Sequence, residues 1–123
     1  MTISIKRAYD PPSPEDGVRI LVDRLWPRGV SKENLRLDMW LKDVAPSDAL
    51  RQWFGHDPKR WTEFERRYSE QLKQNTAAWE PIAEAARKHH VTLIFGAKDT
   101  EHNNAVVLSH FLRTHHHGSK AKA

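Results

Sequence analysis

The feature that most constrains the fold is a short apolar run at residues 91–95, followed at once by a polar loop and then by a helix-like segment. The run consists mostly of β-branched and aromatic residues, which is typical of a strand covered on both faces. Gly96 ends it, and ionisable and amide side chains fill the loop before Ala105. Strand, loop and helix in this order predict an α/β fold, in which ligands bind beyond the carboxyl ends of the strands.

Further strands are predicted by the same kind of pattern. Residues 2–7 alternate apolar and polar side chains, residues 18–26 are rich in β-branched and other apolar residues, and residues 37–41 have a shorter strand-like pattern. The proline-rich loop 10–17 is too short for a parallel crossover, which needs a dozen or more residues. The first two strands are therefore expected to be antiparallel, or not to be neighbours.

Helical periodicity accounts for most of the chain between the strands. Ser47 and Gly55 have the residue types of an N-cap and a C-terminal stop and predict a short helix between them. A longer helix with an apolar stripe follows Asp57. Pro81 predicts that the next helix has its first turn near Glu80, because proline fits best in a first helical turn.

These elements predict a single α/β domain over residues 1–114, with a small, mostly parallel or mixed sheet of three to four strands flanked by helices. The strands around residues 20–24 and 91–95 are expected to lie inside the sheet and to be parallel. Residues 115–123 are polar, small and basic, and a flexible basic tail is expected there.

Composition excludes several classes of protein. The chain has no cysteine, so disulfides, thiolate metal sites and thiol nucleophiles are excluded. It has no apolar run long enough to cross a bilayer, and its first residues lack a signal-peptide pattern, so a cytoplasmic protein without a membrane partner is expected. A net charge of +4 is too small to indicate nucleic acid by itself.

The loop after the last strand has the strongest signal for chemistry. Asp99 and His102 are candidate catalytic residues, and Lys98 and Asn103 are candidate ligand-binding residues. Together they form an acid/base or anion-binding set beside the amino end of a helix. The alternative is that Asp99 or Thr100 only caps that helix while Lys98 and His102 are solvated.

A second group follows the strand at residues 18–26. Asp23 is a third candidate catalytic residue, and Arg24 and Arg28 are candidates for gripping a carboxylate or phosphate. The alternative is an internal pair between Asp23 and an arginine that holds the strand end. His56 is a further ligand-binding candidate, although its segment, residues 53–58, is more often a packed corner between helices.

No metal and no cofactor are expected. The chain lacks an HExxH motif, a GxGxxG motif and a GxxxxGK[ST] motif. The three consecutive histidines at residues 115–117 do not form the rigid tetrahedral site of a catalytic zinc.

Four blocks in order resemble one known family: VRILVDRLWPRG at 18–29, LDMWLKDVAPS at 37–47, WFGHDP at 53–58 and LIFGAKDTEHN at 93–103. On these blocks the chain is similar to the YeaO-like branch of domain-of-unknown-function family 488. The resemblance implies a compact α/β domain without a settled biochemical function. Members of the wider family carry a Cys-His-Arg-like segment in the last strand-to-helix loop. Here residues 101–104 read Glu-His-Asn-Asn, so the resemblance does not imply thiol chemistry.

The leading hypothesis is an enzyme or binding domain for a polar, anionic small molecule, nucleotide-like or nucleoside-like, held between the two polar groups. The sequence leaves the choice between turnover and binding open, and it assigns no oligomeric state. An alternative is a non-enzymatic module that binds nucleic acid or a protein through a basic helical face. That face would comprise Arg51, Lys59, Arg60, Arg66 and Arg67. A third reading is an accessory protein whose loops only stabilise the fold.

Overall fold

The computed structural model describes residues 2–122, with side chains described for residues 2–115. In this part of the chain one parallel sheet is formed by β1 (Ile3–Arg7), β2 (Val18–Leu21), β3 (Met39–Trp40) and β4 (Val91–Phe95). Their order across the sheet is β1-β4-β2-β3. The α/β class is confirmed, and β2 and β4 are the parallel inner strands that the sequence predicts.

The register of the sheet aligns the ends of its strands. Val91 of β4 pairs with both Ile3 of β1 and Val18 of β2. β4 lies between β1 and β2, so β1 and β2 are not neighbours. This is the second of the two arrangements expected from the short loop at residues 10–17. Because the strands are parallel, the residues that follow β2 and β4 emerge at the same edge of the sheet.

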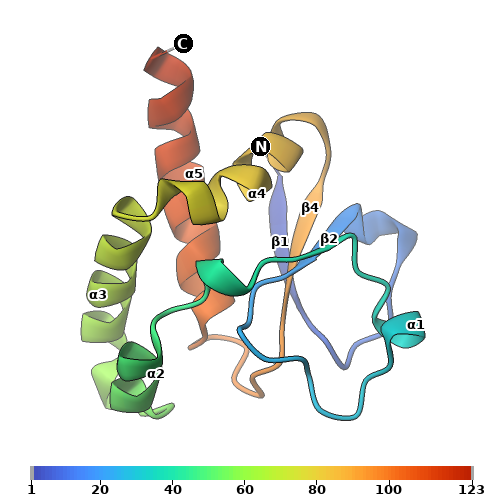
Figure 1. The fold of residues 1–123 in the computed structure, drawn as a ribbon, viewed down its shortest axis with the longest axis horizontal. Helices are drawn as coiled ribbons and strands as arrows, with labels where there is room; N and C mark the ends of the chain where they lie inside the picture. Colours follow the sequence, from blue (N-terminus) through green and yellow to red (C-terminus); the bar gives the residue numbers. More distant parts are fainter. Residues whose placement is uncertain (1, 123) are drawn as a thin grey trace.

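Five helices accompany the sheet in the described residues: α1 (Lys32–Leu35), α2 (Asp48–Phe54), α3 (Trp61–Lys73), α4 (Thr76–Lys88) and α5 (Asn104–Lys122). Short 3-10 turns occur at Pro14–Asp16, Lys42–Val44 and Pro58–Arg60. Figure 1 shows α3 and α5 side by side on one side of the sheet and α1 on the other.

The strands bury side chains on both faces because their side chains alternate. Ile20 and Leu93 point into the main core, which α3, α4 and α5 complete. Leu21 and Ile94 point the other way, into a smaller cluster with Leu35 of α1. All five residues of β4 are buried, which confirms the predicted two-sided burial of this strand.

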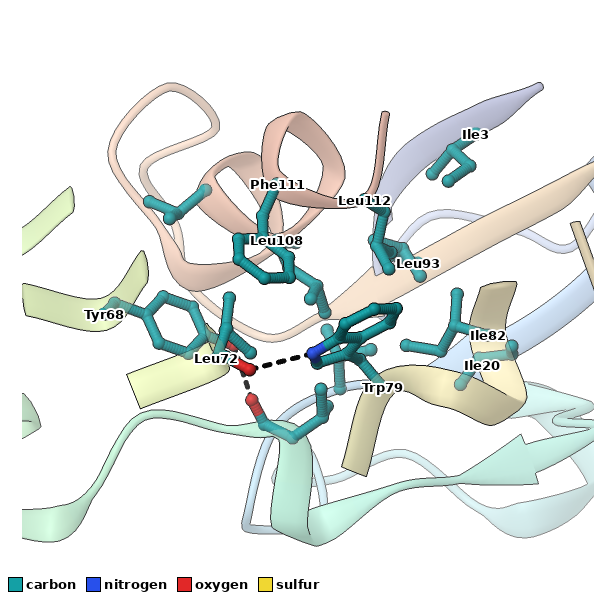
Figure 2. Close-up of a cluster of buried hydrophobic side chains, with 14 of the residues drawn as sticks. Ile3, Ile20, Tyr68, Leu72, Trp79, Ile82, Leu93, Leu108, Phe111 and Leu112 are labelled. Atoms are coloured by element: carbon teal, nitrogen blue, oxygen red, sulfur yellow. Dashed lines mark hydrogen bonds between the residues drawn. The ribbon is translucent and has the colours of Figure 1, made fainter. Parts of the chain in front are cut away.

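The predicted start of α4 near Glu80 is wrong. α4 begins at Thr76 and contains Pro81 in its interior. Trp79 explains the earlier start: its ring is buried in the main core, and its indole N–H donates to the carbonyl of Leu72 at 2.9 Å (Figure 2). Because Pro81 has no N–H, the carbonyl of Ala77 has no donor within the helix. Ala77 is an exposed residue.

The carboxyl-terminal boundary stays a prediction. α5 continues as a helix to Lys122, through residues for which a flexible tail is expected. The side chains of residues 116–123 lie outside the described part of the chain, and two of the three consecutive histidines are among them. Within residues 2–122, no helix combines the length and apolar character needed to cross a membrane.

Candidate functional site

A cavity of about 770 Å³ opens beyond the carboxyl ends of β2 and β4. Its walls come from the loop after β2, from α2 and the residues before it, from the corner after α2, from α3 and from the loop between β4 and α5. The lining residues are Asp23, Arg24, Leu25, Trp26, Pro27, Arg28, Ala45, Pro46, Arg51, Gln52, Phe54, His56, Phe64, Gly96, Ala97, His102, Asn103 and Asn104. The two polar groups singled out in the sequence therefore meet in one cavity.

Six of the eight candidate residues line this cavity: Asp23, Arg24, Arg28, His56, His102 and Asn103. Lys98 is exposed and does not line it. Asp99 does not line it either, but it contacts two residues that do, His102 and Asn103. Whether any of the eight acts in binding or catalysis stays a prediction.

Asp23 joins the two strand ends. One carboxylate oxygen, Oδ2, accepts a hydrogen bond from the backbone N–H of Gly96 at 2.8 Å, and the other, Oδ1, accepts one from the side-chain amide of Asn104 at 3.1 Å. Burial raises the pKa of Asp23, and these two hydrogen bonds and the positive charge of Arg51 only partly oppose it. Among the described side chains, no cation lies within ion-pair distance of Asp23, so the alternative of an internal Asp–Arg pair is not what the structure has.

Two arginines on the cavity wall share one exposed carboxylate. Arg51 approaches Oδ1 of Asp48 at 2.6 Å, and Nε of Arg24 lies 3.5 Å from the same oxygen. Nε of Arg24 is buried but makes no hydrogen bond in the described part of the chain. Both guanidinium groups therefore keep donors that a bound anion could use.

His102 is fixed on two sides. Its Nδ1 lies 3.0 Å from Oδ2 of Asp99, and its ring forms a T-shaped contact with the ring of Trp61, with centroids 5.1 Å apart. The backbone N–H groups of Glu101 and His102 donate to Oδ1 of Asp99 and hold the pKa of Asp99 below its ordinary value. Asp99 thus orients His102 and closes a turn.

The cap of α5 is Asn103, and not Asp99 or Thr100. Oδ1 of Asn103 accepts from the N–H of Val106 at 3.1 Å, and its amide nitrogen donates to the carbonyl of Asp99 at 2.8 Å. Both ends of the Asn103 amide are therefore used to hold the loop to the helix. Its place on the cavity wall is explained by this structural role alone.

Aromatic side chains form the apolar part of the wall. Phe54 and Phe64 stack with ring centroids 4.3 Å apart. Trp26 is fixed by an indole N–H bond of 2.6 Å to the carbonyl of Val30. His56 stands in a left-handed backbone conformation with φ of 57° at the corner after α2, where it is exposed and reaches the cavity.

The lining residues restrict the chemistry of the cavity. They include no serine, threonine, tyrosine, lysine or cysteine, so the nucleophile types among them are the carboxylate of Asp23 and the imidazoles of His56 and His102. Among residues 2–115, no three His, Asp or Glu side chains gather in a way that could hold a metal ion.

Sequence reasoning assigned three of the polar lining residues to no cavity: Gln52 and Asn104 were not proposed as site residues, and Arg51 was placed on the basic helical face. Arg51 and Gln52 lie within α2, and their positions depend on how this short helix packs, through Phe54, against α3. Asn104 could have been found, because it belongs to the same polar loop as His102. Its amide donates to both Asp23 and the carbonyl of Val22.

Comparison with known proteins gives one family and a small set of relatives. The family model described as "Inactive DUF488-N3 subclade" matches residues 2–123. The uncharacterised protein YeaO of Escherichia coli is 43% identical over 114 residues, which cover 93% of this chain and 99% of that protein. The uncharacterised protein Rv3073c of Mycobacterium tuberculosis is 38% identical over 110 residues, covering 89% of this chain and 92% of that protein. No solved structure matches the chain.

Proposed function

The chain belongs to the inactive DUF488-N3 subclade, and we propose that it is a binding domain for a polar, anionic small molecule, nucleotide-like or nucleoside-like, which occupies the cavity beyond β2 and β4. The observation that carries the proposal is the presence of three arginines, Arg24, Arg28 and Arg51, among the residues that line one cavity. Planar guanidinium groups bind carboxylate and phosphate oxygens in pairs, which favours an anion at this wall.

The size and walls of the cavity support a ligand larger than a free ion. A volume of about 770 Å³ lies within the range of small-molecule sites. Phe54 and Trp26 offer apolar surface to a planar ring. A cytoplasmic location, where nucleotides are abundant, is part of this proposal.

Binding without turnover is favoured over catalysis. The lining residues lack the hydroxyl, thiol and amine side chains that act as nucleophiles in many enzymes. The description of the family as inactive agrees with this choice. His102 is then a ligand contact and not a general acid or base.

Calorimetric titration with AMP and with inorganic phosphate tests the proposal. We expect saturable binding of AMP at a single site. Arg24→Gln or Arg51→Gln should weaken it roughly 10-fold or more, because each loses a hydrogen bond between charged groups. Arg66→Gln is the matched control, since Arg66 is exposed, pairs with Glu63 and does not line the cavity. AMP affinity that survives both cavity substitutions in folded protein would overturn the proposal.

The nucleic-acid alternative has one observation in its favour. Arg60 and Arg67 lie over the ring of Trp53, at 5.3 and 4.3 Å from its centroid. Against it, Arg66 and Arg67 both pair with Glu63, which reduces the positive charge of this face. Titration of labelled DNA and RNA at two salt concentrations separates the two functions. Tight, strongly salt-dependent binding that survives Arg24→Gln would favour the alternative.

A further inference from the structure

We infer that Asp23 recognises a hydroxyl group of the ligand, so that the cavity selects phosphate esters carrying free sugar hydroxyls over anions without them. The inference rests on the proposed function and names the class of ligand for the same cavity. The observation behind it is that one carboxylate, that of Asp23, lines a cavity whose other charged side chains are arginines.

Asp23 is the only acidic residue among the described residues that line the cavity. A half-buried carboxylate repels a bare anion placed beside it, and its removal from water is unfavourable, as its raised pKa indicates. A ligand that only presented negative charge would gain nothing from this group. A ligand that also presents a hydrogen-bond donor would gain a hydrogen bond to Asp23.

Asp23 has acceptor capacity left for such a donor. Each carboxylate oxygen can accept about two hydrogen bonds. Oδ2 accepts one from Gly96, and Oδ1 accepts one from Asn104. No cation of the described chain pairs with the group. The remaining acceptor positions belong to a side chain that lines the cavity.

The carboxylate is also held in a fixed orientation. Gly96 and Asn104, which hold its two oxygens, line the cavity themselves. Gly96 approaches so closely that an added Cβ would lie 3.3 Å from Oδ2 of Asp23. The indole N–H of Trp40 donates to the backbone carbonyl of Asp23 at 2.8 Å and fixes the main chain as well. An acceptor fixed in this way recognises a ligand group at a low entropic cost.

The charges around Asp23 favour a neutral donor over a cationic one. The positive charge of Arg51 already acts on Asp23 and partly opposes the rise of its pKa, and Arg24 and Arg28 line the same cavity. An ammonium group beside Asp23 would be repelled by these three guanidinium groups. A hydroxyl carries no such penalty, and a phosphate ester of a sugar supplies hydroxyls and an anion in one molecule.

The test compares AMP with 2′,3′-dideoxy-AMP, which has the same base and charge but lacks both ribose hydroxyls. We expect the wild-type protein to prefer AMP about 10-fold or more, because a site built for a hydroxyl rejects the analogue that lacks it. Asp23→Asn should bring the ratio of the two affinities close to one while leaving the affinity for the dideoxy compound unchanged or higher. Asp48→Asn is the control, since Asp48 contacts Arg24 and Arg51 but does not line the cavity, and it should leave the ratio unchanged.

The outcomes are distinct. Equal wild-type affinity for the two nucleotides overturns the inference and leaves the proposed function standing. A preference for AMP that persists in Asp23→Asn also overturns it, because another group then reads the hydroxyls. A parallel loss of affinity for both nucleotides in Asp23→Asn would mean that Asp23 only holds the loop in place. If neither nucleotide binds to the wild-type protein, the proposed function and the inference both fail. The wild-type comparison needs no variant, so it decides even if Asp23→Asn does not fold.

Discussion

Replacing His102 with alanine separates the part that this residue plays in the loop from its part in the cavity. Two contacts are lost: the hydrogen bond between Nδ1 and Asp99, and the T-shaped contact with the ring of Trp61. The hydrogen bond contributes about 0.5–1 kcal/mol, and the aromatic contact contributes about 0.5–1 kcal/mol. The side chain is 33% exposed, so no large cavity term is added.

The sum predicts a loss of about 1–2 kcal/mol in the free energy of unfolding, which is roughly 3–8 °C in Tm for a domain of this size. This exceeds the roughly 0.5 kcal/mol expected for an ordinary surface position, because the ring has two specific partners. AMP affinity should fall about 3–10-fold through one lost hydrogen bond. Lys98→Ala, in the same loop but outside the cavity, should change neither quantity.

Urea unfolding followed by circular dichroism, with calorimetric titration of AMP on the same samples, measures both quantities. A loss of stability above about 3 kcal/mol would mean that His102 is a core residue, and the reasoning from its exposure would be wrong. Unchanged AMP affinity in a stable His102→Ala variant would remove His102 from the site.

Two further predictions concern the frame that positions the cavity. Burial acts to raise the pKa of Asp16, but hydrogen bonds from its neighbours outweigh burial, and the pKa is lowered. Ionised Asp16 therefore stabilises the fold at pH values above its ordinary pKa. This stabilisation is lost as the pH falls through the lowered pKa. Asp16→Asn should cost about 3 kcal/mol at pH 7 and reduce the loss of stability that the wild-type protein shows as the pH falls below about 4, as measured by urea unfolding across pH. An unchanged pH profile would contradict the assignment. Gly17→Ala should lower the free energy of unfolding by at least about 3 kcal/mol, because the backbone has φ of 65° and the new Cβ would lie 2.2 Å from the carbonyl oxygen of His90. That oxygen accepts the hydrogen bond from the N–H of Val18, the first residue of β2. Gly29→Ala is the control: its backbone has φ of 79°, but an added Cβ would have no atom within 4 Å, so the cost should be only about 1–2 kcal/mol. Thermal melts of both variants measure the difference, and equal losses of stability would refute the argument from the clash.

The sequence by itself determined the elements whose signals are local. The apolar run of β4 and the Ser47 and Gly55 boundaries of α2 depend on side-chain type and on neighbours a few residues away, and the structure confirms them. The family could also be recognised from four short blocks. The start of α4 could not be predicted, because burial of Trp79 outweighs the local preference of Pro81.

Only the tertiary structure decided which polar side chains share the cavity. The sequence placed Asp23 and His102 near strand ends, but the strand order and register brought those ends together. The packing of α2 against α3 added Arg51, whereas Lys98 is exposed and does not line the cavity. Side-chain direction at such positions depends on contacts between segments far apart in the chain, which a local pattern does not contain.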